Sequence, residues 1–141
     1  MFQEELGLVC NASKAKVNLL KNNPVGYFLA SLFGGMYIGF GILLIFTAGG
    51  ILNAAGSPAT KIVMGACFGV ALSLVVIAGA ELFTGNNFVM TVGLFRKEVT
   101  FQDTLVLWVV CWIGNQLGAV ILGVLYHVTG LASGPVGEFI A

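Results

Sequence analysis

The chain has 141 residues, of which 58% are hydrophobic and only 9% are charged, and its formal net charge is zero. A soluble domain carries about a quarter charged residues, so this composition excludes a water-soluble globular protein and indicates an integral membrane protein. No basic patch supports nucleic-acid binding. The lipid bilayer is therefore the first expected partner, and no nucleic acid is expected.

The three cysteines, Cys10, Cys67 and Cys111, lie far apart, and two of them fall inside apolar segments. None has the CxxC or Cys/His spacing of a metal or redox site. We therefore expect packed small side chains rather than a metal site, and no cofactor.

Residues 1–21 predict an amphipathic helix that lies on the membrane surface, before a transmembrane domain over residues 22–141. Glu4 and Glu5 stand where a cleavable signal peptide would have basic residues. Pro24 suits the first turn of the next helix. The sequence leaves open whether the first helix is a solvated lead-in or a gating lever. The predicted apolar face contains Phe2, Leu6, Val9, Val17 and Leu20.

Three apolar segments are long enough to cross the ~30 Å hydrocarbon core of a bilayer. The first covers residues 25–52 and the third covers residues 105–127, and neither contains a charged residue. The second starts near Ile62 and is interrupted after Gly79. A tail rich in small residues, 130–141, follows the third segment. The sequence thus predicts an all-α membrane protein with three spans, the second of them broken.

The basic residues of the short loops predict the orientation, because cytoplasmic loops carry an excess of lysine and arginine. One side of the membrane would hold Lys14, Lys16, Lys21, Arg96 and Lys97, and only Lys61 would lie on the other. The N-terminus is therefore expected in the cytoplasm.

Glycine recurs four residues apart in every span, as Gly35 with Gly39, Gly65 with Gly69, and Gly114 with Gly118. Such pairs allow helix backbones to approach closely in lipid, where no hydrophobic effect drives association. We expect these pairs to form packing faces.

The interruption of the second span, residues 80–87, is the feature that bears most on function. Its sequence is Ala-Glu-Leu-Phe-Thr-Gly-Asn-Asn, and a short apolar piece follows at residues 88–95. Backbone at bilayer depth must stay helical unless protein or a cavity satisfies it. Polar groups there are costly and usually functional. Broken helices of this kind line solute pathways.

Thr84 is predicted to cap a half-helix that begins at Gly85, with its hydroxyl accepting the N–H near Asn87. The amides of Gly85, Asn86 and Asn87 would then face the membrane interior. The N-terminus of a helix carries roughly +0.5 charge, so this site favours an anion over a cation.

Leu82 and Phe83 are apolar and suit a constriction that excludes water and hydrated ions. Glu81 would repel an anion, so we expect it to turn away from the path. There it would hold the loop by accepting backbone N–H bonds or would be protonated, with Gly85 and Asn86 as further loop support. Phe68 lies one helical repeat before Leu72, so both side chains can face the break; ordinary packing is the alternative for Phe68.

At these residues the chain resembles the formate/nitrite transporter family of anion channels. The resemblance lies in Ala80–Gly85, the family signature of the broken helix, and in Asn23-Pro24, Gly65–Phe68 and Gly114–Gly118. It runs across nearly the whole chain.

The resemblance implies an aquaporin-like fold of six spans in two inverted halves, assembled as a homopentamer with one pore per protomer in the bacterial plasma (inner) membrane. This chain would be the N-terminal half, either a fragment or one of two polypeptides. By position, the pathway would be lined or narrowed by Phe68, Leu72, Leu82, Phe83 and Thr84. The family's central histidine lies in the second half, and His127 does not match it.

The implied function is passage of small monovalent anions, namely nitrite, formate or hydrosulfide, and the first span resembles the nitrite branch most. An enzyme is not expected. The alternatives are a neutral-solute channel of aquaporin or ammonia type, and a small glutathione-dependent membrane enzyme. The latter needs cationic clamps for its substrate, and Arg96 is the single arginine in the chain.

Overall fold

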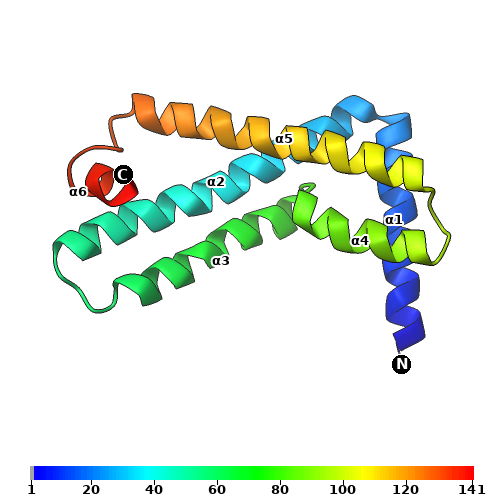
Figure 1. Cartoon of the computed structure of the whole chain (residues 1–141), viewed down its shortest axis with the longest axis horizontal. Helices are drawn as coiled ribbons and strands as arrows, with labels where there is room; N and C mark the ends of the chain where they lie inside the picture. The colour runs from blue at the N-terminus through cyan, green and yellow to red at the C-terminus, as the bar shows by residue number, and fades with distance from the viewer. Residues whose placement is uncertain (1) are drawn as a thin grey trace.

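The computed structural model describes residues 2–141, and over this range it is built from six α-helices (Figure 1). Met1, the first residue of the predicted amphipathic segment, lies outside the described residues. The helices are α1 (Phe2–Asn22), α2 (Pro24–Ala54), α3 (Thr60–Ala78), α4 (Phe83–Phe95), α5 (Phe101–Val128) and α6 (Gly134–Ile140). The predicted all-α class is confirmed.

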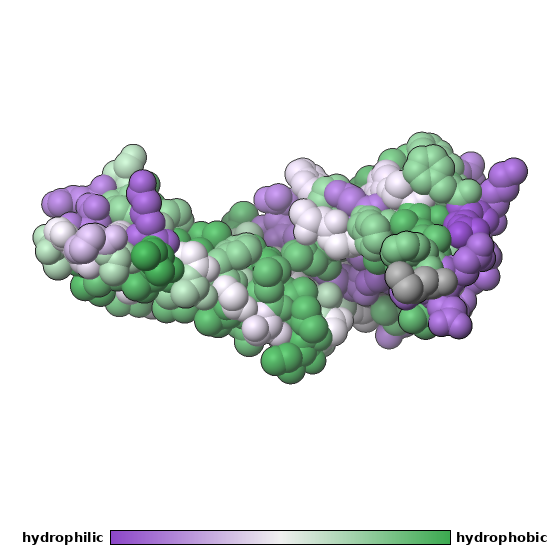
Figure 2. Space-filling model, turned by 90° about the horizontal axis from the view of Figure 1, so that it is seen from below, coloured by the Kyte–Doolittle hydropathy of each residue, from purple (hydrophilic) through white to green (hydrophobic). Residues whose placement is uncertain are grey.

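Three of these helices, α2, α3 and α5, are long and apolar enough to cross a membrane. Figure 2 shows polar residues gathered at the two ends of the elongated molecule and apolar residues over the stretch between them. This distribution matches a chain whose middle lies in hydrocarbon and whose ends lie in the headgroup regions.

Helix α1 runs across the end of the other helices rather than alongside them (Figure 1). It contacts α2, α4 and α5, and it buries Cys10, Ser13 and Val17. The predicted apolar face is only partly right, because Phe2 is exposed while Val17 is buried. The face of α1 that includes Val17 is therefore used against the chain's own helices.

Helix α2 begins where its sequence predicts, because Asn23 accepts the N–H of Gly26 at 2.9 Å and Pro24 occupies the first turn. It then packs closely against α5. A Cβ added at Gly114 would lie 2.6 Å from Cβ of Ser31, and one at Gly118 would meet the carbonyl of Leu32. The predicted packing faces in these two helices are confirmed.

The third glycine pair behaves differently. A Cβ added at Gly65 or Gly69 would meet nothing within 4 Å, so the packing predicted for this pair does not occur within the described chain. Helix α3 instead approaches α2 through Ala71, whose side chain faces Gly41. The reason is rotational, since Gly65 and Gly69 lie on a face of α3 that points away from α2.

The buried core lies where α1, α2, α4 and α5 converge. It contains Val17, Tyr27, Met90, Leu107 and Cys111, and part of Phe83 packs against it. This cluster fixes α4, the helix that follows the break, against three other helices.

Within the tail of small residues, residues 134–140 form a short helix, α6, beside α2. Pro135 stands in its first turn, a signal that the sequence carried. Helices α2 and α6 pack closely at Gly50, since a Cβ added there would lie only 2.7 Å from Cα of Val136.

Candidate functional site

The second span is broken, and the break is shorter than predicted. Helix α3 ends at Gly79, whose φ of 63° is left-handed. The N–H of Ala80 donates to the carbonyl of Val75 at 3.0 Å, and that of Gly79 donates to Val76 at 3.3 Å. This is a Schellman ending, which favours glycine because other residues are strained at this φ. Helix α4 begins four residues later, at Phe83.

The prediction that Thr84 caps a half-helix starting at Gly85 is wrong. Helix α4 begins at Phe83, its N-cap residue is Leu82, and it has no side-chain cap from that residue. The N–H of Asn86 already donates to the carbonyl of Leu82 at 2.9 Å. The amides without an intrahelical acceptor are therefore those of residues 82–85, not those of Asn86 and Asn87.

The cap comes instead from α5. The side-chain oxygen of Asn115 accepts the N–H of Phe83 at 2.8 Å, and its amide nitrogen donates to the carbonyl of Glu81 at 2.9 Å. An amide side chain can do both at once because it carries an acceptor and a donor. The side chain of Thr84 is left exposed at the start of α4.

Glu81 is buried, but its predicted partners are wrong. Its carboxylate accepts from Nζ of Lys16 at 2.7 and 2.6 Å and from Nδ2 of Asn86 at 2.9 Å, rather than from backbone amides. Its backbone N–H donates to the carbonyl of Ala30 at 3.1 Å. The loop is thus held by both the backbone and the side chain of Glu81.

Asn86 lies at the centre of a buried polar cluster behind the break. Its side-chain nitrogen lies 2.9 Å from the hydroxyl of Tyr27 and 3.2 Å from the sulfur of Cys111. The indole N–H of Trp108 donates to the carbonyl of Asn86 at 3.3 Å. Asn86 is 1% exposed and Tyr27 is fully buried. This cluster locks the first turn of α4 to α2 and α5.

A cavity of about 390 Å³ opens beside the break. Its lining residues include Lys16, the ion-pair partner of Glu81, and five of the predicted site residues, namely Leu72, Glu81, Leu82, Gly85 and Asn86. Leu72 of α3 and Leu82 of the break therefore border one space, whereas neither Phe68 nor Thr84 is among its lining residues.

Leu82 and Phe83 do not line the same space. Phe83 borders a separate apolar groove on the α5 side, of about 320 Å³, with Leu105, Trp108 and Trp112. The two residues are neighbours in sequence, but the restart of the helix sends their side chains in different directions. Of these two residues, only Leu82 lines the cavity at the break.

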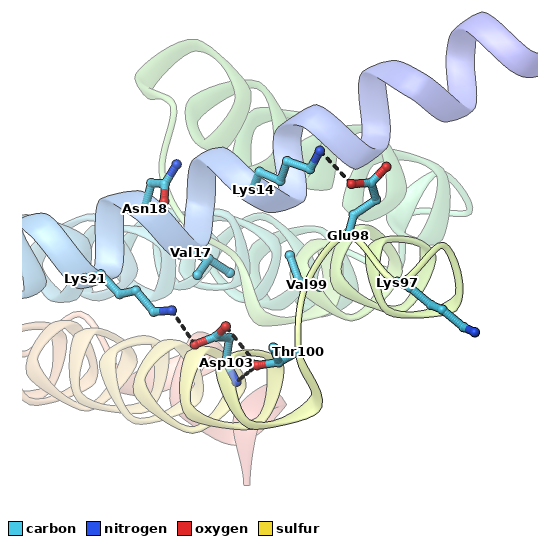
Figure 3. Close-up of a pocket in the computed structure, with 9 residues that line it drawn as sticks. All are labelled: Lys14, Val17, Asn18, Lys21, Lys97, Glu98, Val99, Thr100 and Asp103. Carbon is cyan, nitrogen blue, oxygen red and sulfur yellow. Dashed lines mark hydrogen bonds and ion pairs between the residues drawn. The ribbon is translucent and has the colours of Figure 1, made fainter.

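A second group of charged residues ties α1 to the α4–α5 turn (Figure 3). Lys14 pairs with Glu98 at 2.6 Å and Lys21 pairs with Asp103 at 2.8 Å. Asp103 is fixed by Thr100, whose hydroxyl accepts the N–H of Asp103 at 3.1 Å and caps α5. These pairs link the C-terminal half of α1 to the α4–α5 turn and to the start of α5.

Sequence reasoning missed Lys16, Tyr27 and Asn115 as members of the site. Asn115 carried a signal, because an amide inside an uncharged span is costly unless it has a partner. Lys16 was used only to predict the orientation in the membrane, and nothing in the sequence indicates that it pairs with Glu81.

Comparison with known proteins identifies the family. The family described as Formate/nitrite transporter matches residues 3–141. The chain is 41% identical over 118 residues to Nitrite transporter NirC of Salmonella typhimurium, which covers 83% of this chain and 43% of that protein. It is 42% identical over 112 residues to a Probable formate transporter of Methanothermobacter thermautotrophicus, which covers 77% of this chain and 41% of that protein.

A solved structure named FNT family ion channel superposes on the chain with a TM-score of 0.83 and 36% sequence identity, covering 90% of this chain and 50% of that one. The chain therefore spans about half the length of the relatives that it matches. These relatives are named as transporters or channels, which removes the membrane-enzyme alternative. The chain belongs to the formate/nitrite transporter family.

Proposed function

We propose that the complete transporter containing this chain passes small monovalent anions through a pore in each protomer of a homopentamer. The observation that carries this proposal is the start of α4, a helix N-terminus that opens beside the cavity at the break. The charged residues that line this cavity, Lys16 and Glu81, pair with each other at 2.6 Å, so their charges cancel.

The electrostatics of the break favour an anion. The amides of Thr84 and Gly85 have no acceptor within α4, because the first intrahelical bond is made by Asn86. The helix dipole adds roughly +0.5 charge at this end. Neutralisation of Glu81 by Lys16 removes the repulsion that a bare carboxylate would impose on an entering anion.

The apolar part of the path supplies selectivity. Leu72 and Leu82 line the cavity, and we assign Phe68, further along α3, to its extension once the rest of the transporter closes the pore. A dry constriction opposes a hydrated ion strongly, because an unpaired charge loses its solvation there. Thr84, exposed just past Leu82, offers a hydroxyl that replaces part of the lost water.

Nitrite, formate and hydrosulfide are the anions that we assign to this path. Relatives named for nitrite and for formate match the chain at similar identity, 41% and 42%. Nitrite and formate are therefore the first anions to test. We place the protein in the bacterial inner membrane with its N-terminus in the cytoplasm, from the excess of lysine and arginine on that side.

Flux in vesicles tests the proposal. The complete transporter is reconstituted into liposomes with valinomycin, so that potassium can follow an entering anion, and swelling is followed in potassium nitrite, formate, hydrosulfide and gluconate, and with glycerol as a neutral solute. We expect swelling in nitrite, formate or hydrosulfide and none in gluconate. Permeation of water or glycerol without any of the three small anions would favour the neutral-solute channel and reject the proposal.

A further inference from the structure

Asn115 joins three parts of the chain through a single side chain. From its place on α5, its nitrogen donates to the carbonyl of Ser31 on α2 at 2.6 Å and to that of Glu81 in the break at 2.9 Å. Its oxygen accepts the N–H of Phe83 at the start of α4 at 2.8 Å. Both amide hydrogens and the oxygen are therefore used, which fixes the orientation of the amide group.

Asn115 can contact the break because two residues of α2 that lie against it are glycines. A Cβ added at Gly34 would meet the carbonyl of Glu81 and would lie 3.2 Å from Nδ2 of Asn115. A Cβ added at Gly35 would lie 2.7 Å from Cα of Asn115. Larger residues at either position would push α5 or the loop away. The close packing of α2 and α5 thus serves to bring this amide to the break.

We propose that Asn115 is a positioning residue for anion passage. It occupies the Phe83 amide and fixes the carbonyl of Glu81, so that the first turn of α4 presents the amides of Thr84 and Gly85 as the free donors. The expected effect of Asn115 on anion flux rests on the proposed function, whereas its hydrogen bonds to the first turn of α4 and to the loop do not.

No other side chain takes the place of Asn115 at this turn. Leu82 supplies no side-chain cap. Asn86 fixes the turn through its side-chain bonds to Tyr27 and Glu81, and it does not accept from the backbone amides at the start of α4. At bilayer depth water does not replace a lost partner freely, so the Phe83 amide depends on Asn115. Removing the side chain therefore leaves the Phe83 amide without its acceptor, and it leaves the Glu81 carbonyl with only the longer contact from the sulfur of Cys111, at 3.6 Å.

The test compares Asn115→Leu and Asn115→Ala with Gln116→Leu in the complete transporter. Gln116 neighbours Asn115 on α5 but is exposed, so its replacement controls for polarity lost from the same helix. Asn115→Ala serves if the leucine does not fold, because it leaves space in which water can reach the freed amide. Amide hydrogen exchange over residues 80–87 and the ratio of nitrite to formate flux are both measured.

We expect the Asn115 variants to speed exchange over residues 80–87 about tenfold, as loss of one hydrogen bond implies, with exchange over the rest of α4 unchanged. We also expect the nitrite-to-formate flux ratio to change, which a loss of folded protein alone would not cause. Gln116→Leu should leave both quantities unchanged. Wild-type exchange in both Asn115 variants, or an unaltered flux ratio, overturns the inference. If the wild type carries none of nitrite, formate and hydrosulfide, the proposed function fails, and the exchange result alone then tests whether Asn115 holds the first turn of α4.

Discussion

Lys16 of α1 and Glu81 of the break form a two-pronged ion pair although 65 residues separate them. The nitrogen of Lys16 lies 2.7 and 2.6 Å from the two carboxylate oxygens, and the side chain of Glu81 is only 9% exposed. This pair connects the helix outside the bundle to the interruption inside it. Any displacement of α1 therefore disturbs the loop that borders the cavity.

Replacing Lys16 by methionine should destabilise the protein by about 2 kcal/mol, because the buried carboxylate of Glu81 loses its cation. The double variant Lys16→Met with Glu81→Gln should recover most of this loss, since glutamine still accepts from Asn86. Thermal unfolding of the purified protein in detergent measures both. Equal stability of wild type and Lys16→Met would show that the pair contributes nothing.

Thr84→Val should change stability by no more than about 0.5 kcal/mol, because Thr84 is exposed and does not cap α4. It should nevertheless slow anion flux, because the hydroxyl beside the free amides is lost. Thr91→Val, in the same helix and away from its N-terminus, is the matched control. Equal flux for wild type and Thr84→Val would make the hydroxyl a bystander.

Gly118→Ala should destabilise the protein by about 1–3 kcal/mol, the usual cost of overpacking. Its added Cβ would meet the carbonyl of Leu32, a backbone atom that cannot move aside cheaply. Gly123→Ala on the same helix would meet nothing within 4 Å, so it should be neutral or slightly stabilising. Chemical denaturation compares the two, and similar losses in both would contradict the observed packing of α2 on α5.

The proposed orientation predicts that the α4–α5 turn and the α2–α3 loop label from opposite sides. Single cysteines at Lys97 and at Ala55, both exposed, are placed in a background without native cysteines. A membrane-impermeant thiol reagent added outside intact cells should label Ala55→Cys and leave Lys97→Cys unlabelled until the cells are opened. The reverse pattern would place the N-terminus outside the cytoplasm.

The architecture was predictable because it depends on long apolar segments and on strong local signals. Residues 25–52 and 105–127 contain no charge and became α2 and α5, each extended by a few residues at its ends. Gly79 ended α3 because its left-handed backbone suits glycine. These features depend on residues that are close in the sequence, so they could be predicted without knowledge of tertiary contacts.

The details of the site were not predictable in the same way. Thr84 fits the sequence pattern of an N-cap, yet Asn115 supplies the cap from a residue 32 positions away. Lys16 and Glu81 likewise meet only because α1 crosses the end of the bundle. Tertiary partners of this kind override local capping preferences, and one sequence does not reveal which distant side chain will arrive.

The most direct test of the central claim, that anions pass beside the break, is nitrite and formate flux through liposomes that contain Leu82→Trp in the complete transporter. Leu82 lines the cavity at the break, so the indole ring of tryptophan, which is larger than the leucine side chain, should block the cavity. Flux should fall about tenfold or more, the effect of a barrier raised by ~1.4 kcal/mol. Val124→Trp, at an exposed position of α5, should conduct like the wild type. Undiminished anion flux in folded Leu82→Trp protein would contradict the account.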